Sequence, residues 1–264
     1  MLEKIGKKRI DRENKMTESV KKEIHALIIG DEILSGKRKD KHLTHLIETL
    51  KKHNFHISRA DYISDDTEEI KKTLEQKKGV IVFCFGGIGA TPDDCTRSAA
   101  AQAHKKLLIR HPEAKVLIEK QFGEEAYPKR ILMADLPEEA SLIPNSVNNI
   151  PGFFINQHFF MPGFPEMAWP MIDWVIENHL SKTEKSKKYE DFSIWLDNVS
   201  ESSLIDLMDL TQSKHQRIKI YSLPKMHPKK MLELGVRGEE GYVKDALNFI
   251  KDNLDKMKIS WRNL

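Results

Sequence analysis

Cysteine and long apolar runs are both scarce in this chain. Of its 264 residues only Cys84 and Cys95 are cysteines, and they do not form a CxxC pair. We therefore expect no disulfide framework and a cytoplasmic protein. No apolar run approaches the roughly 20 residues of a membrane-spanning helix, and residues 1–22 lack the apolar core of a secretory signal. Membrane and secreted classes are not expected.

An excess of positive charge is also missing from most of the chain. The net charge is +3, but residues 1–22 hold eight basic and four acidic side chains, so the remainder carries −1. Nucleic acid is therefore not an indicated partner, because its binding needs a basic surface. The polar segment 1–22 is expected to be a disordered basic extension, with Met16 as an alternative start.

What the sequence does contain is a series of strand-then-helix units. Apolar patterns predict strands at 23–30, 55–63 and 79–85 and helices at 42–54 and 65–78. A long helix is predicted from Asp94 to about Arg110, followed by mixed, largely helical sequence to Ile131, short strands and an aromatic-rich helix. Repeated β-α units predict an α/β fold with a mostly parallel sheet.

A different pattern follows residues 181–190. This segment is expected to be a linker, because SKTEKSKK contains no apolar residue. Over 191–264 the predicted order is β-α-β-β-α-β, which is typical of a small ferredoxin-like α+β domain. We therefore expect a large domain at 23–180 and a small domain at 191–264, whose favoured role is contacts in a homo-oligomer.

A glycine-rich loop follows the strand at 79–85. In GGIGATPDD, Gly86, Gly87 and Gly89 permit positive φ and close approach of a ligand to the backbone. The next helix would present free N–H groups to an anion such as phosphate, and Thr91 adds a hydroxyl. A tight strand-to-helix turn explains the glycines equally well.

Carboxylate pairs stand beyond three consecutive predicted strands. They are Asp31 and Glu32, Asp65 and Asp66, and Asp93 and Asp94. The carboxyl ends of parallel strands share the ligand-binding edge of a sheet, and a phosphate among carboxylates requires a divalent cation, Mg²⁺ or a transition metal. We expect the metal on Glu32, Asp65, Asp93 and Asp94. Independent helix caps are the alternative.

Other polar and aromatic candidates carry less weight. His42 and His45 are expected on a solvated helix face, since no third ligand follows at metal spacing. Cys95 has no histidine nearby in the sequence and is interpreted as structural. Trp169 and Trp174 are expected in the core or on an oligomer surface rather than in a stacking platform.

Five motifs together resemble the MoaB/Mog-type molybdopterin-binding family, most closely the version in competence/damage-inducible protein A (CinA). They are GDEILSG, the aspartate after the second strand, GGIGATPDD, PNSVNNIPGF and MPGFPEM. The resemblance implies a three-layer α/β/α fold with Asp65 and Asp94 as catalytic residues. It also implies a ligand site at Gly30, Asp31, Gly86, Gly87, Gly89, Thr91, Asn145, Gly152 and Gly163.

The sequence departs from the family pattern at positions that affect which ligand the pocket can hold. Ala90 stands where proline is usual, and Asn148, Asn149 and Ile150 stand where many relatives have Gly-Thr-Ala, which would narrow the pocket. The C-terminal amidohydrolase domain of CinA-type proteins is not found in this sequence, so its activity is not implied.

Three functions stay open. The first is a metal-dependent nucleotide pyrophosphatase acting on an ADP-ribose-like substrate, as the resemblance implies. The second is molybdopterin binding in cofactor biosynthesis. The third is a non-catalytic binding module that retains the fold.

Overall fold

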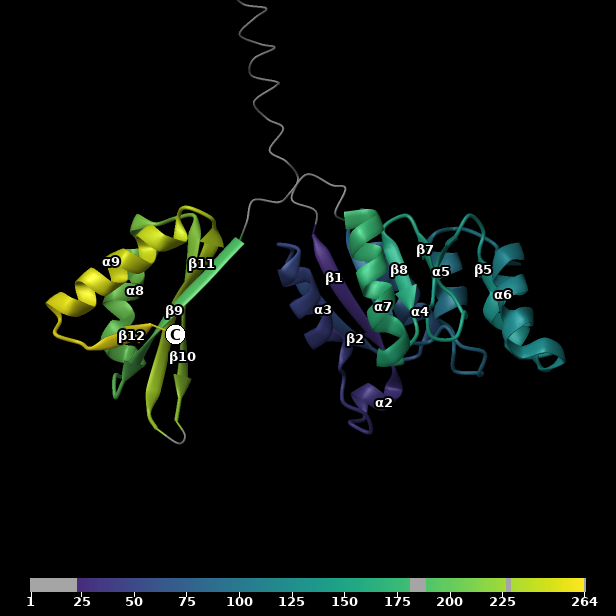
Figure 1. Ribbon diagram of the computed structural model, residues 1–264, viewed down its shortest axis with the longest axis horizontal. Helices are drawn as coiled ribbons and strands as arrows, with labels where there is room; N and C mark the ends of the chain where they lie inside the picture. Colours follow the sequence, from purple (N-terminus) through teal and green to yellow (C-terminus); the bar gives the residue numbers. More distant parts are fainter. Residues whose placement is uncertain (1–22, 181–188, 227–228, 264) are drawn as a thin grey trace, which may run out of the picture. The chain divides into compact units, whose positions relative to one another are not determined.

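The computed structural model describes residues 23–180, 189–226 and 229–263, and the chain divides into two compact units, Met1–Thr183 and Glu184–Leu264 (Figure 1). The expected extension at 1–22 and most of the expected linker at 181–190 lie outside the described residues. Within the described ranges, no helix is long and apolar enough to cross a membrane.

A six-stranded sheet forms the centre of the first unit. Its order is β2 (Arg59–Ile63), β1 (Ile24–Ile29), β3 (Ile81–Phe85), β8 (His158–Met161), β7 (Gly152–Ile155) and β6 (Ser141–Ile143). The first four strands are mutually parallel, whereas β7 and β6 each pair antiparallel with their neighbour. The predicted mostly parallel sheet is confirmed.

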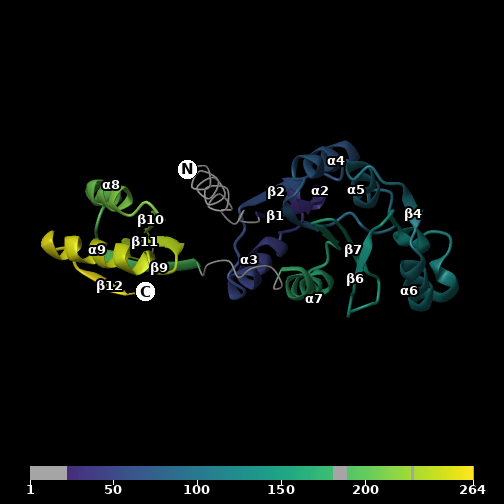
Figure 2. The same ribbon diagram turned by 90° about the horizontal axis from the view of Figure 1, so that it is seen from above.

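Helices cover both faces of this sheet, because alternate side chains of each strand point to opposite sides. Ala26 and Ile28 of β1 belong to the core cluster under α3 (His42–Lys52) and α7 (Pro165–Val175), whose last turn continues as a π-helix, η3 (Ile176–Leu180). Leu27 and Ile29 belong to the cluster under α4 (Thr67–Gln76), α5 (Thr96–Ala103) and α6 (Pro112–Phe122). Figure 2 shows α3 and α7 on one side and α4 and α5 on the other. The three-layer α/β/α fold is confirmed.

The long helix predicted from Asp94 to about Arg110 is wrong in its length. The helix α5 ends at Ala103, and Lys105 adopts a positive φ of 56° while the Lys106 N–H donates to the carbonyl of Ala101 (2.8 Å). This closure is a common way for helices to end. Leu108–Arg110 then forms β4, which pairs with β5 (Asp135–Pro137) in a two-stranded ribbon.

The remaining elements of the first unit are short. A one-turn helix, α2 (Asp31–Leu34), follows β1 directly, and the 3-10 helices η1 (Gly123–Ala126) and η2 (Arg130–Ala134) lie between α6 and β5. The helix α2 places Asp31 and Glu32, the carboxylates that follow β1, at the carboxyl edge of the sheet.

The second unit has the predicted β-α-β-β-α-β order. The antiparallel sheet runs β10 (Ile218–Lys225), β11 (Met231–Glu239), β9 (Tyr189–Asp197) and β12 (Trp261–Asn263). A 3-10 turn, η4 (Glu201–Leu204), leads into α8 (Ile205–Lys214), and α9 (Val243–Lys256) precedes the last strand. Apolar residues of α8 and α9 pack with those of the sheet in one buried cluster. The ferredoxin-like fold is therefore confirmed.

Candidate functional site

The carboxyl ends of β1, β3 and β8 meet at Gly86, the first residue after β3. Its N–H donates to the carbonyl of Met161 at the end of β8 (3.0 Å). Its φ is 104°, and a Cβ at this position would overlap the carbonyl oxygen of Ile29 at the end of β1. Packing therefore requires glycine at position 86 whether or not a ligand binds.

A second glycine loop faces the first. A Cβ built on Gly163, beyond β8, would lie 3.5 Å from the Cα of Gly86, and among the described residues outside its two chain neighbours no other atom would lie within 4 Å of it. Gly163 is exposed, and its φ lies outside the left-handed region. Neither packing nor backbone geometry requires glycine here. The two loops therefore approach to near contact, and the surface at this point is formed by backbone.

Gly87 holds the first loop against the start of α5. Its φ is 67°, its carbonyl accepts a hydrogen bond from the N–H of Thr96 (3.0 Å), and a Cβ would overlap the Oγ1 of Thr96. The same Cβ would lie 3.4 Å from the Oδ1 of Asp65. Thr96 is fully buried, and its Oγ1 has no hydrogen-bond partner among the described residues. The glycine loop, an unpartnered hydroxyl and Asp65 thus lie together.

The charges of carboxylates from three strand ends act on Asp65. The Oδ2 of Asp65, after β2, accepts a hydrogen bond from the N–H of Asp31, after β1 (3.0 Å). Burial raises the pKa of Asp65, the Asp31 N–H opposes that shift, and the charges of Asp31, Glu32 and Asp93 raise the pKa further. Like charges that act on one another disfavour ionisation, so a bound cation would stabilise the ionised form of Asp65.

Asp94 faces its own loop instead of this cluster. Its Oδ2 accepts from the N–H of Thr91 (2.8 Å) and from the Thr91 hydroxyl (2.5 Å), and a Cβ on Gly89 would overlap the same oxygen. Asp94 therefore braces the loop 89–94, and Gly89 is small because the carboxylate lies over it. A catalytic role for Asp94 stays a prediction.

Arg97 also holds the loop 89–94 in place. The buried guanidinium donates to the carbonyls of Gly89 (2.8 Å), Leu132 and Asp135 (3.0 Å for the last). Burial lowers the pKa of Arg97, whereas the charges of Asp135 and Asp94 raise it. Arg97 is not among the predicted site residues, and no local signal identifies it, because two of its partners lie 35 and 38 residues further along the chain.

The other predicted ligand residues have packing explanations of their own. Glu32 folds over Gly30, where a Cβ would lie 2.9 Å from its Oε2. The Asn145 amide donates to Asn148 Oδ1 (2.7 Å) and the Ile150 carbonyl (2.9 Å), while its oxygen accepts from the Val147 N–H (3.0 Å). Asn145 thus shapes the loop in which it lies.

Gly152 is buried in β7. A Cβ at this position would lie 2.5 Å from the carbonyl oxygen of Phe160 in β8. Close packing of these two strands therefore accounts for this glycine.

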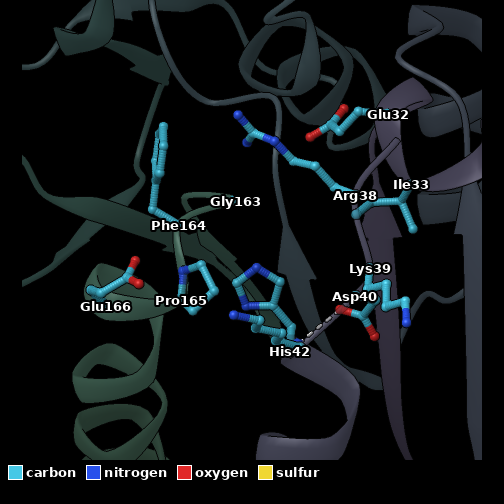
Figure 3. A pocket seen from close by; sticks show the side chains of 11 residues that line it. Glu32, Ile33, Arg38, Lys39, Asp40, His42, Gly163, Phe164, Pro165 and Glu166 are labelled. Carbon is cyan, nitrogen blue, oxygen red and sulfur yellow. Dashed lines mark hydrogen bonds between the residues drawn. The ribbon is translucent and has the colours of Figure 1, made fainter. Parts of the chain in front are cut away.

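A pocket of about 240 Å³ adjoins the glycine loops. It is lined by Glu32, Ile33, Arg38, Lys39, Asp40, Lys41, His42, Gly163, Phe164, Pro165 and Glu166 (Figure 3). Gly163 belongs to both the pocket and the second glycine loop, and Glu32, which also lines the pocket, acts on the pKa of Asp65. The pocket therefore shares Glu32 and Gly163 with the candidate site, whereas Gly86, Gly87 and Asp65 are not among its lining residues.

The expectation of a solvated face for His42 is wrong. Only 5 % of His42 is exposed, and its ring stacks on Phe85 with a centroid distance of 4.6 Å. His45 stacks on Trp169 at 4.3 Å. This helix face is buried because α7 packs beside α3, a contact between distant parts of the chain.

No group of three or more carboxylate, imidazole or thiol side chains that could hold a metal ion is found in the described part of the chain. Mg²⁺ typically uses one or two protein carboxylates together with oxygens of a phosphate ligand. The crowded carboxylates around Asp65 fit that mode of binding, and a metal at this edge stays a prediction.

Comparison with known proteins agrees with this architecture. Residues 25–182 match the model of a family described as a probable molybdopterin binding domain. A CinA-like protein of Syntrophotalea carbinolica is 30% identical over 168 residues, which make up 60% of this chain and 40% of that protein. Protein PF0476 of Pyrococcus furiosus is 28% identical over 255 residues, covering 89% of this chain and 98% of that protein.

A solved structure shows the same fold. The protein CinA of Thermoplasma acidophilum, described as of unknown function, matches with a TM-score of 0.55 and 24% identity over 60% of this chain and 98% of that chain. The chain spans less than half the length of the first CinA-like relatives that it matches. It belongs to the molybdopterin-binding-domain family, as the five motifs predict, and it is similar to CinA-like proteins.

Proposed function

We propose that this protein binds a phosphate-bearing nucleotide at the two glycine loops and hydrolyses a pyrophosphate bond of the ADP-ribose type. The observation that carries the proposal is the near contact of two small residues, Gly86 and Gly163, beside Asp65, on which the charges of three strand ends act. Backbone N–H groups and small residues suit close approach of a phosphate. The carboxylates would repel the phosphate unless a cation lies between them.

Asp65 has the central role in this proposal. Asp65, together with Asp31 or Glu32 and the oxygens of the phosphate, would hold a divalent cation, which supplies charge neutralisation and activates water when bound. Gly87 and Gly163 keep the backbone close to the phosphates, and Thr91 and Arg97 hold the loop in place through Asp94 and Gly89. In the net reaction, water adds to phosphorus, one P–O bond of the anhydride breaks, and AMP and ribose 5-phosphate are released.

Neighbouring aspartates provide a matched test. Wild type, Asp65→Asn and Asp66→Asn are assayed for release of AMP from ADP-ribose with Mg²⁺, with Mn²⁺ and with EDTA. Asp65→Asn should lower the rate by about 10²-fold or more, on the scale of losing a group that acts in the transition state. Asp66 caps α4 by accepting from the Glu69 N–H (2.8 Å), and asparagine caps equally well, so Asp66→Asn should keep the rate.

Thermal unfolding separates fold from chemistry. Mg²⁺ should raise the melting temperature of the wild type and of Asp66→Asn but not of Asp65→Asn. Without metal, Asp65→Asn should melt at the same or a higher temperature, because the substitution removes a crowded charge. A wild type without turnover or metal response would contradict the proposal.

Molybdopterin binding is the second candidate, and the description of the matched family favours it. Tight pterin binding by an enzyme that leaves ADP-ribose intact would select this function. Absence of turnover, metal response and pterin binding together would select the non-catalytic module. A homo-oligomer stays a prediction, which light scattering on the purified protein measures.

A further inference from the structure

The four-stranded sheet of the second unit has a covered face and an open face. Ile194 and Leu196 of β9 and Leu232 and Leu234 of β11 belong to the buried cluster to which η4, α8 and α9 contribute. Side chains alternate along a strand, so the residues between these four, with their register partners on β10 and β12, form the open face. The described helical elements of this unit all pack on the covered face.

The open face carries residue types that are typical of protein interfaces. Trp195 and Met231 lie on its two central strands, and Leu223 of β10 is 55 % exposed. The ring of Tyr221 lies over β11, since a Cβ on Gly235 would overlap its Cζ and hydroxyl oxygen. Tyrosine, tryptophan, methionine and arginine are enriched where proteins associate, and the open face holds all four types.

The charges on the open face balance. Within the four strands it holds four acidic and four basic side chains, which sum to zero. Binding of nucleic acid requires an excess of positive charge, whereas a neutral face of mixed charge does not repel a second copy of itself. The balance therefore favours a second copy as the partner. The acids are Asp191, Asp197, Glu233 and Glu239, and the bases are Lys219, Lys225, Arg237 and Arg262.

Some of these charges already have partners in the same chain. Asp191 accepts from the hydroxyl of Tyr221 (2.7 Å), and Asp197 lies 3.3 Å from Lys229 at the rim and 3.6 Å from Arg262. These contacts leave the charges at the two ends of the face largely neutralised. The pairing of copies is therefore decided by the central strand β11.

Glu233 and Arg237 make β11 complementary to itself. They lie on the open face, and Gly235 is midway between them. A two-fold axis between two facing sheets, perpendicular to β11 at Gly235, places Glu233 of each copy opposite Arg237 of the other. Packed sheets lie about 10 Å apart, a distance that these two long side chains span together. Glu233 accepts from the Ser193 hydroxyl (2.7 Å), and a carboxylate has acceptor capacity for a further donor.

We infer that the open face of the second unit binds the open face of a second copy of this chain, in a two-fold dimer whose axis passes at Gly235. Opposite charges then meet twice, and the two Tyr221 rings meet at the axis. The inference is independent of the proposed function, because its residues lie outside the candidate site.

The size of the face sets the expected strength of the dimer. Three strands of eight or nine residues, spaced about 4.8 Å apart and about 27 Å long, cover roughly 400 Å² in flat projection, or about 800 Å² for two copies. Side-chain relief adds to this area, which lies at the lower end of specific interfaces. We therefore expect a dissociation constant of about micromolar or weaker.

Two matched leucines test which layer of the unit associates. Leu223 on the open face is 55 % exposed, and Leu210 of α8, in the helical layer, is 51 % exposed. Sedimentation velocity of the full chain, from about 1 to about 200 μM, measures association by mass action. Leu223→Glu should weaken association by at least about tenfold, because it places a carboxylate in the interface twice. Leu210→Glu should associate as the wild type does.

Charge reversal tests the two-fold pairing itself. Arg237→Glu alone places two carboxylates opposite each other, and Glu233→Lys alone places two cations opposite each other, so each variant should dimerise at least about tenfold more weakly than wild type. An equimolar mixture of the two variants should recover association, since each contact then joins opposite charges. Circular dichroism and thermal unfolding check that every variant is folded.

Three results would overturn the inference: a wild type that is monomeric over this range, a Leu223→Glu variant that associates like Leu210→Glu, or a mixture that associates no more tightly than its components. A monomeric wild type that binds a fluorescent single-stranded RNA oligonucleotide, with loss of binding in Leu223→Glu, would assign the face to nucleic acid instead. Every variant should bind ribose 5-phosphate as the wild type does, so this test is separate from that of the phosphate site.

Discussion

Alanine substitutions at Gly163 and Gly87 should differ sharply in their effect on stability. At Gly87 an L-residue must adopt φ near 67°, and its Cβ overlaps the Oγ1 of fully buried Thr96. The left-handed conformation costs about 1–2 kcal/mol, and overpacking adds about 1–3 kcal/mol. We expect Gly87→Ala to lower the free energy of unfolding by about 2–5 kcal/mol, a large share of the 5–15 kcal/mol typical of a domain.

Gly163→Ala should be nearly neutral for stability. Its Cβ meets only the Cα of Gly86, at 3.5 Å, which is an ordinary van der Waals contact. The cost should stay within about 0.5 kcal/mol, and alanine also restricts the unfolded chain, which stabilises by a similar amount. The methyl group nevertheless covers backbone at the point where the two loops meet, against which we place the phosphate, so affinity for ribose 5-phosphate should fall about tenfold, or about 1.4 kcal/mol.

Urea denaturation and calorimetry together check this pair. Gly87→Ala should shift the urea midpoint far below that of the wild type, whereas Gly163→Ala should keep the midpoint and lose the ligand. Two results would refute the reasoning: a Gly87→Ala variant as stable as the wild type, or a Gly163→Ala variant that binds phosphate compounds normally. The first would show that the glycine loop is not held by Thr96, and the second that the phosphate does not lie where the two loops meet.

Three further predictions concern Arg97, His104 and Cys95. Arg97→Met should destabilise by about 3 kcal/mol or more in urea, because it removes the hydrogen bonds of a buried guanidinium to the carbonyls of Gly89, Leu132 and Asp135; an unchanged midpoint would contradict this role. Burial lowers the pKa of His104 from 6.5 to about 4, with His158 adding to the shift, so the folded state binds fewer protons than the unfolded state. Stability should be full above pH 6.5 and fall as the pH drops towards 4, with a shallower fall in His104→Asn measured by urea titrations across that range. Burial also raises the pKa of Cys95, so iodoacetamide at pH 7.5 should modify Cys95 more slowly than free cysteine, and rapid labelling followed by mass spectrometry would contradict this.

The sequence was sufficient to predict the features that depend on residues close together in the chain. The apolar runs of β1 and β3 predict buried strands, because both faces of a central parallel strand are covered. The carboxylates that follow three strands were expected at one edge, and the charges that act on Asp65 come from those strand ends. The site's location therefore follows from the strand pattern and the rule for parallel sheets.

Contacts between distant segments were not predictable in the same way. Whether His42 faces solvent depends on α7, which lies more than a hundred residues later in the chain and covers that face. The Asp94 carboxylate could have turned towards Asp65 or towards Thr91, and the sequence is compatible with both. The helix predicted to reach Arg110 ends early because Lys105 takes a left-handed conformation, which its side chain does not signal.

The three hydrogen bonds of Arg97 have a mechanical consequence. They connect the loop at Gly89 to η2 and to β5. The mobility of this candidate ligand loop therefore depends on the β4–β5 ribbon, which contributes none of the predicted site residues. Loop and ribbon should open as one unit in hydrogen exchange. An insertion between α6 and β5 should therefore change the ligand affinity of the site without altering any residue near it.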